Sequence, residues 1–180
     1  MIPAAHSVNG QPDGQDKWRM TVNIRAFAPA DIDAANQVWN EVVEAGVAFP
    51  QMEKLDRESG LEFFQAQSFT GVCEEDGEIL GLYILHPNNV GRCGHICNAS
   101  YAVASRARGR GLGEALVRHC LDKAKELGFG ILQFNAVVSS NTPALNLYRK
   151  LGFTQLGTIP GGFLMKDGSY QDIIPHYKKL

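Results

Sequence analysis

The sequence predicts one α/β domain built on a mixed sheet. Segments in which apolar residues alternate, as in strands, are interleaved with segments in which they recur at helical spacing. With 180 residues and 44% hydrophobic content, the chain is long enough for one substantial core. We place the domain at residues 21–180, because residues 1–20 are rich in Gly, Pro, Asn and Gln and are expected to form a mobile tail.

The first half of the domain is expected to run strand, helix, helix, strand, strand. The periodicity assigns these elements, in order, to residues 21–27, 31–46, 56–67, 68–74 and 78–86. The last two strands flank the turn residues Glu75, Asp76 and Gly77, so we predict an antiparallel hairpin there.

The second half is expected to run strand, helix, strand, helix, strand, strand. These elements fall, in order, at residues 95–103, 112–127, 131–138, 143–151, 153–158 and 172–178. Gly128 and Gly152 follow the two helices, and glycine is typical of a helix end. Residues 160–169 are Gly-rich, and we predict a loop there between the last two strands.

Charge and hydrophobic patterning restrict the class of partner. The net charge of -2 and the pI near 6.2 argue against a nucleic-acid binder, which usually presents a strongly basic face. The first residues lack a basic start followed by an apolar run, and no later segment approaches about 18 consecutive apolar residues. We therefore expect a cytoplasmic protein that acts on a small molecule, with neither a nucleic acid nor a membrane as partner.

Cys93, His95 and Cys97 form a short cluster of potential metal ligands, because thiolate and imidazole are the usual ligands of zinc. A structural zinc site needs four ligands, and this cluster has no second pair at a suitable spacing. Buried cysteine more commonly acts as a small apolar residue. We predict no metal site.

Residues 108–113 predict a cradle for phosphate, formed by Arg108, Gly109, Arg110, Gly111, Leu112 and Gly113. They lie between a strand and an amphipathic helix, and the unpaired N–H groups of a helix start bind anions. Glycines allow the backbone to approach a bulky pyrophosphate, and the two arginines add positive charge. The segment fits neither the dinucleotide-binding fingerprint nor the nucleotide-triphosphate loop. A Gly-rich turn without a ligand is the alternative.

Two motifs together resemble those of the GNAT N-acetyltransferase superfamily. They are Arg108-x-x-Gly111-x-Gly113 after a strand that ends at Val103, and Asn141-x-x-Ala144-x-x-Leu147-Tyr148-x-Lys150-x-Gly152-Phe153. The resemblance implies a GNAT-like, mostly antiparallel central sheet flanked by helices, in which the strands at 95–103 and 131–138 are parallel and splay apart. It also implies that acetyl-CoA is the cosubstrate and that its pantetheine arm lies in the splayed junction.

The same resemblance implies roles in acetyl transfer for three residues. It places the Tyr148 hydroxyl near the cofactor sulfur, where a phenol can protonate the leaving thiolate; a core aromatic residue is the alternative. It assigns polarisation of the thioester carbonyl to a backbone amide of the splayed strand, here that of Val103. Asn141 would bond the pantetheine arm or the reacting centre, although Asn before Thr-Pro-Ala is equally typical of a helix N-cap.

The general base is open, because the strand before the cradle lacks the glutamate that many family members carry there. Water can relay the proton of the amine, or Asn98, Asn135 and Asn141 can orient an amine that arrives neutral. His95 is a further candidate for the base, and a structural histidine is the alternative.

The tract Gly-His-Ile-Cys-Asn-Ala, with Asn135 and Asn141, also resembles the GNAT branch that acetylates proline analogues such as azetidine-2-carboxylate. That resemblance implies that Asn98 binds the substrate carboxylate, while Asn135 and Asn141 hold the imino group and the developing oxyanion. Pairing of Asn98 with Asn135 across neighbouring strands is the alternative, since buried amides need partners.

The sequence thus favours acetyl transfer from acetyl-CoA to the amino or imino nitrogen of a small molecule, such as an amino acid or an analogue. One alternative is acetylation of a protein N-terminus or lysine, which would favour an open groove. Another is a coenzyme A-binding sensor without turnover, which would favour a buried Tyr148 and no polar cleft at the sulfur. A homodimer is compatible with the sequence.

Overall fold

The structure, a computed structural model, describes residues 22–180. The predicted mobile tail at 1–20 and the start of the first predicted strand at Thr21 lie outside the described residues. Within the described chain, no helix is both long and apolar enough to cross a bilayer.

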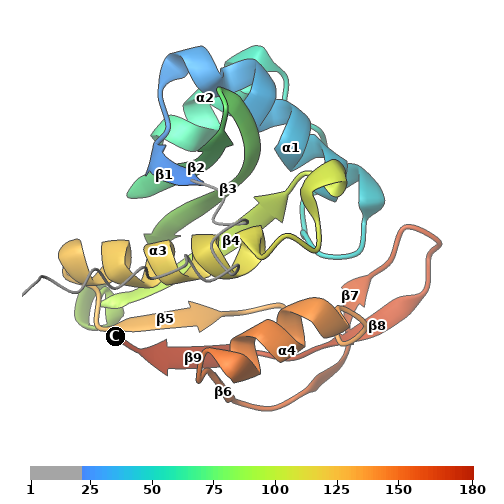
Figure 1. The fold of residues 1–180 in the computed structure, drawn as a ribbon. Helices are drawn as coiled ribbons and strands as arrows, with labels where there is room; N and C mark the ends of the chain where they lie inside the picture. The colour runs from blue at the N-terminus through green and yellow to red at the C-terminus, as the bar shows by residue number, and fades with distance from the viewer. Residues whose placement is uncertain (1–21) are drawn as a thin grey trace, which may run out of the picture.

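The described chain is an α/β fold with one large and one small sheet (Figure 1). The large sheet contains β1 (Asn23–Ala26), β2 (Phe69–Glu75), β3 (Glu78–Pro87), β4 (Ile96–Val103), β5 (Ile131–Phe134), β6 (Thr154–Gln155) and β9 (His176–Lys179). The small sheet contains β7 (Ile159–Leu164) and β8 (Tyr170–Ile173). The α-helices are α1 (Ile32–Ala45), α2 (Arg57–Gln65), α3 (Leu112–Glu126) and α4 (Thr142–Lys150), and short 3-10 helices span Pro29–Asp31, Gly91–Cys93 and Ser105–Ala107.

The large sheet is mixed and mostly antiparallel, as predicted. Its strand order is β1-β2-β3-β4-β5-β9-β6, in which β4 and β5 are parallel and the other neighbours are antiparallel. The parallel pair is short: only Ile96 and Cys97 of β4 are in register with β5. Beyond them the two strands diverge, which confirms the splayed junction.

The helices cover opposite faces of the sheet. On one face, the Tyr83 hydroxyl of β3 lies 2.8 Å from His119 Nδ1 of α3, and α4 is joined to α3 by the ion pair of Lys150 with Glu114 at 2.6 Å. On the other face, Trp39 of α1 is fully buried and contacts Phe64 of α2 with 5.8 Å between ring centroids. The junction between β4 and β5 therefore lies between two helical layers.

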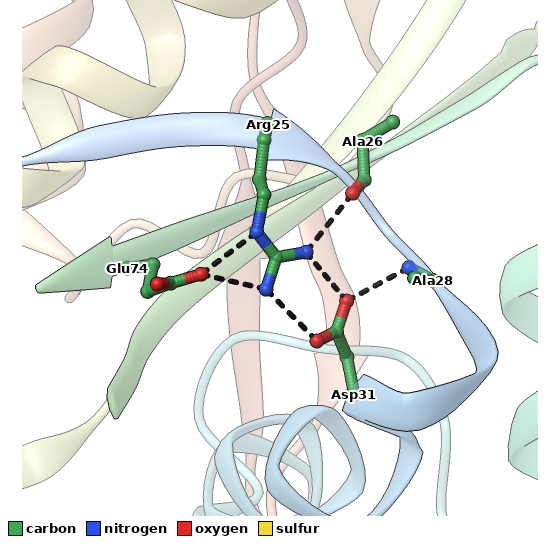
Figure 2. A network of polar contacts seen from close by, with 5 residues as sticks. All are labelled: Arg25, Ala26, Ala28, Asp31 and Glu74. Carbon is green, nitrogen blue, oxygen red and sulfur yellow. Dashed lines mark hydrogen bonds and ion pairs between the residues drawn. The ribbon is translucent and has the colours of Figure 1, made fainter. Parts of the chain in front are cut away.

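Arg25 of β1 ties the start of the fold together (Figure 2). Its guanidinium donates to Glu74 Oε2 of β2 at 2.7 Å and to both carboxylate oxygens of Asp31 at 2.7 and 2.9 Å. Asp31 also accepts from the Ala28 N–H at 2.7 Å. These hydrogen bonds stabilise the charged carboxylate of Asp31 and hold its pKa below its usual range. The bond from Arg25 has the largest effect.

The strand predicted at 131–138 is too long, because β5 ends at Phe134. The residues that follow leave β4 and turn toward the small sheet instead. The Ile174 N–H donates to the Val137 carbonyl at 2.8 Å, and Val138 forms an isolated bridge with Ile173. The apolar residues 136–138 therefore pack beside the small sheet and do not continue the pairing with β4.

The Gly-rich loop predicted at 160–169 is wrong, since β7 and β8 form an antiparallel hairpin there. Gly161 has a φ of 62°, and the register shifts between Ile159 and Phe163, as in a bulge. A Cβ atom on Gly162 would come within 2.5 Å of the Ile173 side chain, so glycine allows the close approach of the two strands.

The last two predicted strands are also shorter in the structure. The strand expected at 153–158 is reduced to β6, and the strand expected at 172–178 is divided between β8 and β9. Pro175 lies at that division, where it cannot donate a ladder hydrogen bond.

Candidate active site

The edge of β4 that faces β5 is open beyond the paired residues. The Ala104 N–H donates to the Leu80 carbonyl of β3 at 2.9 Å. Because N–H groups alternate between the two edges of a strand, the Val103 N–H points the opposite way, into the gap. The same alternation directs the backbone groups of Ala99 and Tyr101 into the gap. These donors and acceptors are available to an extended ligand between the strands.

A cavity of about 610 Å³ occupies this gap. It reaches both helical layers, since Val42 of α1 and Val117 of α3 contribute to its lining. Among the predicted site residues, those that line it are Asn98, Val103, Arg108, Gly113, Asn135, Asn141 and Tyr148, whereas Gly109, Arg110, Gly111 and Leu112 do not. Its volume lies within the usual range for small-molecule sites.

The cradle borders the cavity at the start of α3. Gly111 is the N-cap of α3 with a φ of 80°, and Gly109 has a φ of 76°, both in the left-handed region that glycine adopts without strain. A Cβ atom at either position would meet no atom within 4 Å, so the space beside the helix start is open. The first-turn N–H groups that the helix leaves unpaired can therefore be reached by an anion.

The side chains of the cradle differ in what they contact. Arg108 lines the cavity, but Arg110 forms an ion pair with Glu75 at the end of β2, with 2.6 Å between Nη2 and Oε2. Leu112 is buried in the core, so only its backbone can contribute to an anion site. Arg108 is thus the cradle arginine that faces the cavity.

Tyr148 of α4 borders the cavity while its ring packs in an aromatic group. The distance between ring centroids is 4.3 Å to Phe134 and 5.4 Å to Phe153. Burial raises the pKa of the Tyr148 phenol well above its ordinary range, so the group stays protonated at neutral pH. The residue thus packs as a core aromatic does and also lines the cavity.

Asn141 is the N-cap of α4, as one of its two predicted roles requires. Its Oδ1 accepts from the Ala144 N–H at 3.3 Å. Asn141 also lines the cavity, and the cap engages Oδ1 alone. The Nδ2 donors of the same amide can serve a ligand.

Asn98 and Asn135 occupy different environments. Asn98 lies on the face of β4 that points toward α1, because Tyr101 is opposite Tyr83 on the α3 face and side chains alternate along a strand. Asn135 follows β5 and exchanges two hydrogen bonds with Asn88, of 2.7 and 3.2 Å. Among the described residues, no hydrogen bond joins Asn98 to Asn135. Asn135 is therefore held by a partner that the sequence pattern did not indicate.

The comparisons with known proteins fit this geometry. A model of the Acetyltransferase (GNAT) family matches residues 36–153, which include the cradle and the whole of α4. The chain belongs to this family. A GCN5-related N-acetyltransferase from Kribbella flavida has the same fold with a TM-score of 0.82 and 34% identity, and the match covers 88% of this chain and 98% of that one.

Two curated relatives differ in the share of their length that this chain covers. N-acetyltransferase aca1 of Schizosaccharomyces pombe is 37% identical over 81 residues, but the chain spans only 39% of the length of aca1. The L-amino acid N-acyltransferase MnaT of Escherichia coli is 25% identical over 144 residues, which cover 77% of this chain and 83% of MnaT.

The GNAT site fits acetyl-CoA in two respects. The open space beside Gly109 and Gly111 suits a pyrophosphate, and the unpaired edge of β4 suits the amide groups of a pantetheine arm. Arg108 is placed to add a positive charge at the phosphate end. The residues present therefore agree with the cosubstrate that the sequence implied.

The sequence analysis missed Tyr101, which lines the cavity, and Asn88, which does not line it but holds Asn135. The Tyr101 hydroxyl is buried next to the Cys120 thiol of α3, and burial raises the pKa of this phenol well above its ordinary value. Tyr101 lines the cavity from the α3 face. Neither residue carried a local signal: Tyr101 reads as an ordinary strand residue, and Asn88 lies in a loop.

The remaining candidates lie outside the cavity. His95 does not line it, and the His95 carbonyl accepts from the Gly130 and Ile131 N–H groups at 2.9 and 3.3 Å.

Within residues 22–180, no group of three or more His, Cys, Asp or Glu side chains is gathered in a way that could hold a metal.

The hairpin of β7 and β8 extends on the side of the molecule where the segment after α1 lies (Figure 1). Lys166, in the turn of this hairpin, donates from Nζ to the Glu44 carbonyl at 3.0 Å. Its side chain also lies against Gly46, where a Cβ atom would be 3.1 Å from Lys166 Cβ. The hairpin thus connects the end of α1 to the segment after β5, which it meets at the bridge of Val138 with Ile173.

Proposed function

We propose that this GNAT chain transfers the acetyl group of acetyl-CoA to the amino or imino nitrogen of a small amino acid or an amino acid analogue. The observation that carries the proposal is that one cavity is lined by Arg108 and Gly113 of the cradle, by the open edge of β4, by Tyr148 and by the amides of Asn98 and Asn141. A phosphate site, an acyl-transfer centre and an acceptor site are thereby available to one pair of substrates.

The residues of the cavity account for the chemistry of the transfer. The Val103 N–H is directed into the gap, where it can donate to the carbonyl oxygen of a thioester as negative charge develops there. The Tyr148 phenol can give its proton to the departing sulfur. The nitrogen of a neutral acceptor amine attacks the thioester carbon, and the carbon–sulfur bond breaks. Among the described residues no carboxylate lines the cavity, so we propose that the surplus proton on the nitrogen passes to water.

The polar groups on the α1 face favour a carboxylate-bearing acceptor. Asn98 and Ser100 line the cavity there, and their uncharged donors suit a substrate carboxylate. A polyamine would need acidic side chains that this lining does not offer. The likeness to MnaT, which is named for L-amino acids, points in the same direction.

Within this class, a cyclic imino acid such as azetidine-2-carboxylate is the more specific candidate. Its carboxylate would lie at Asn98 and its ring nitrogen near Asn141. Asn135, whose amide is paired with Asn88, would support the site by fixing the chain after β5 and would contact the acceptor only by exchanging that partner.

A small acceptor also agrees better with the hairpin than a protein acceptor does. An extended peptide requires an open groove, whereas the contact of Lys166 with the end of α1 crosses the side of the molecule on which the acceptor would bind. This contact supports a bounded acceptor site.

The proposal is tested by measuring release of coenzyme A thiol with a panel of amino acids, imino acids, polyamines and lysine-rich peptides. We expect amino or imino acids to give the highest kcat/KM. Asn98→Ala should raise the KM for the acceptor about ten-fold or more, the effect of losing a hydrogen bond to a charged group, and should leave the KM for acetyl-CoA nearly unchanged.

Asn89→Ala provides the matched control, since Asn89 is exposed and does not line the cavity. Higher kcat/KM values for polyamines or basic peptides would contradict the proposed acceptor. Equal effects of Asn98→Ala and Asn89→Ala would remove Asn98 from the acceptor site.

A further inference from the structure

One side of the cavity is an apolar wall that the chemistry of acetyl transfer does not require. The wall is formed by the end of α1 and the segment after it, through Val42, Ala45, Val47, Ala48, Phe49 and Pro50. It lies on the same face of the sheet as Asn98, opposite the cradle. Among the described residues that line the cavity, Arg108 is the only charged one, and it belongs to the cradle.

Phe49 is the most firmly held part of this wall. It is only 7% exposed and lies against Trp39, with 4.4 Å between ring centroids. Trp39 in turn contacts Phe63 and Phe64, with centroid distances of 5.2 and 5.8 Å. Phe49 cannot turn away from the cavity without opening this aromatic cluster, so it presents a fixed surface to a ligand.

The segment after β5 supplies further apolar lining. Ala136, Val137 and Val138 line the cavity, and Val137 and Val138 are buried. The backbone of this segment is fixed by the bond from the Ile174 N–H to the Val137 carbonyl and by the bridge of Val138 with Ile173. The apolar surfaces on both segments are therefore preformed.

We infer that the acceptor carries an uncharged, apolar side chain, that this chain binds against the apolar wall, and that Phe49 limits its length. The inference rests on the proposed function, which leaves the side chain of the acceptor undefined. A charged side chain would lose its hydration here without gaining a partner, whereas each buried methylene group adds to binding.

The test is a graded series of acceptors: alanine, 2-aminobutyrate, norvaline and norleucine, with serine, aspartate and lysine for comparison. For the wild-type chain we expect kcat/KM to rise up to about four-fold for each added methylene until Phe49 is reached, and then to fall. Phe49→Ala and the milder Phe49→Leu should move the optimum toward longer side chains. Phe63→Ala is the matched control, because Phe63 belongs to the same aromatic cluster but does not line the cavity.

Calorimetric titration of the same acceptors into the chain saturated with coenzyme A separates this inference from the proposed function. If the series binds in the predicted order without turnover, the proposed function fails and the apolar wall stands. If acceptors are acetylated but aspartate or lysine gives a higher kcat/KM than norvaline, the inference is overturned and the function stands. An optimum that shifts equally in the Phe49 and Phe63 variants would also overturn it, and absence of both binding and turnover would contradict both.

Discussion

The two parts of the sheet that meet at β4 and β5 are held together in different ways. On the N-terminal side, β3 spans 10 residues and pairs along its length with β2 and β4, and Arg25 and the aromatic cluster around Trp39 add further ties. On the C-terminal side, β5 spans 4 residues and β6 only 2. The long ladders make a rigid support, and the short strands leave β4 with an open edge. The candidate site can therefore lie where the two parts of the sheet meet, because the N-terminal part forms a fixed support.

The strongest test of this comparison is Tyr148→Phe, on the C-terminal side. Since the phenol is proposed to protonate the leaving thiolate, kcat should fall about 10²- to 10⁴-fold, while ring packing and the KM for acetyl-CoA change little. Steady-state kinetics and thermal unfolding measure the two effects. Tyr170→Phe is the control, because Tyr170 is exposed on β8 and outside the cavity. An unchanged kcat at saturating substrates would make Tyr148 a packing residue.

A substitution at the cradle should have the next largest effect, on cofactor affinity. Gly113→Glu places a negative charge at the pyrophosphate site, and charges about 4 Å apart near a protein surface repel by about 4 kcal/mol, so the Kd for coenzyme A should rise at least about ten-fold. Gly113 suits the test because its φ is not positive and an added Cβ would meet only Leu147, at 3.9 Å.

Gly157→Glu adds the same charge at an exposed position where a Cβ atom would meet nothing within 4 Å. Calorimetric titration of coenzyme A should separate the two variants. Equal affinities in folded Gly113→Glu and wild-type chains would remove the cradle from the cofactor site.

The smallest effect is expected on the N-terminal side, where Arg25→Met should alter stability and leave kcat unchanged. Loss of the bonds to Asp31 and Glu74 should lower the free energy of unfolding by about 1–2 kcal/mol, since Arg25 remains partly exposed to solvent. Arg57→Met is the control: its partner Asp33 is largely exposed, so the loss should stay below about 1 kcal/mol.

The Arg25→Met effect should also depend on pH. Because the folded state lowers the pKa of Asp31, the stabilisation is complete above the unfolded pKa of about 3.9 and is lost as the pH falls through the lower folded value. Urea unfolding at pH 7 and at steps below pH 4 should show the difference from wild type shrinking. A constant difference would mean that packing of the Arg25 side chain, not its charge, supports β1.

The fold was predictable from the sequence where the apolar periodicity of an element matches the partner against which it packs or pairs. The apolar patterns of the β2–β3 hairpin and of the helix α3 match their partners, although the hairpin register shifts between Cys73 and Glu74. The C-terminal side was less predictable because its glycines serve two purposes. Gly161 and Gly162 indicate a loop by composition, yet they allow β7 to bulge and to approach β8 closely.

The candidate site divides in a similar way. The cradle and Asn141 follow from local chemistry, because a helix start and an N-cap need particular residues in a particular order. The pairing of Asn135 with Asn88 and the ion pair of Arg110 with Glu75 join residues far apart in the sequence, and neither leaves a local pattern. Proximity of that kind arises only from the folded sheet.

The open edge of β4 also bears on association between molecules. An unpaired strand edge at a surface invites pairing with another chain, and proteins usually blunt such edges with charges, bulges or covering elements. In this molecule the groups of Ala99, Tyr101 and Val103 point into a cavity between two helical layers instead. A second protein strand, with side chains on both faces, is too broad to enter, whereas a slender chain of methylene and amide groups is not. Because the unpaired edge of β4 is buried in the cavity, it is protected from pairing with another chain and is open only to a narrow ligand.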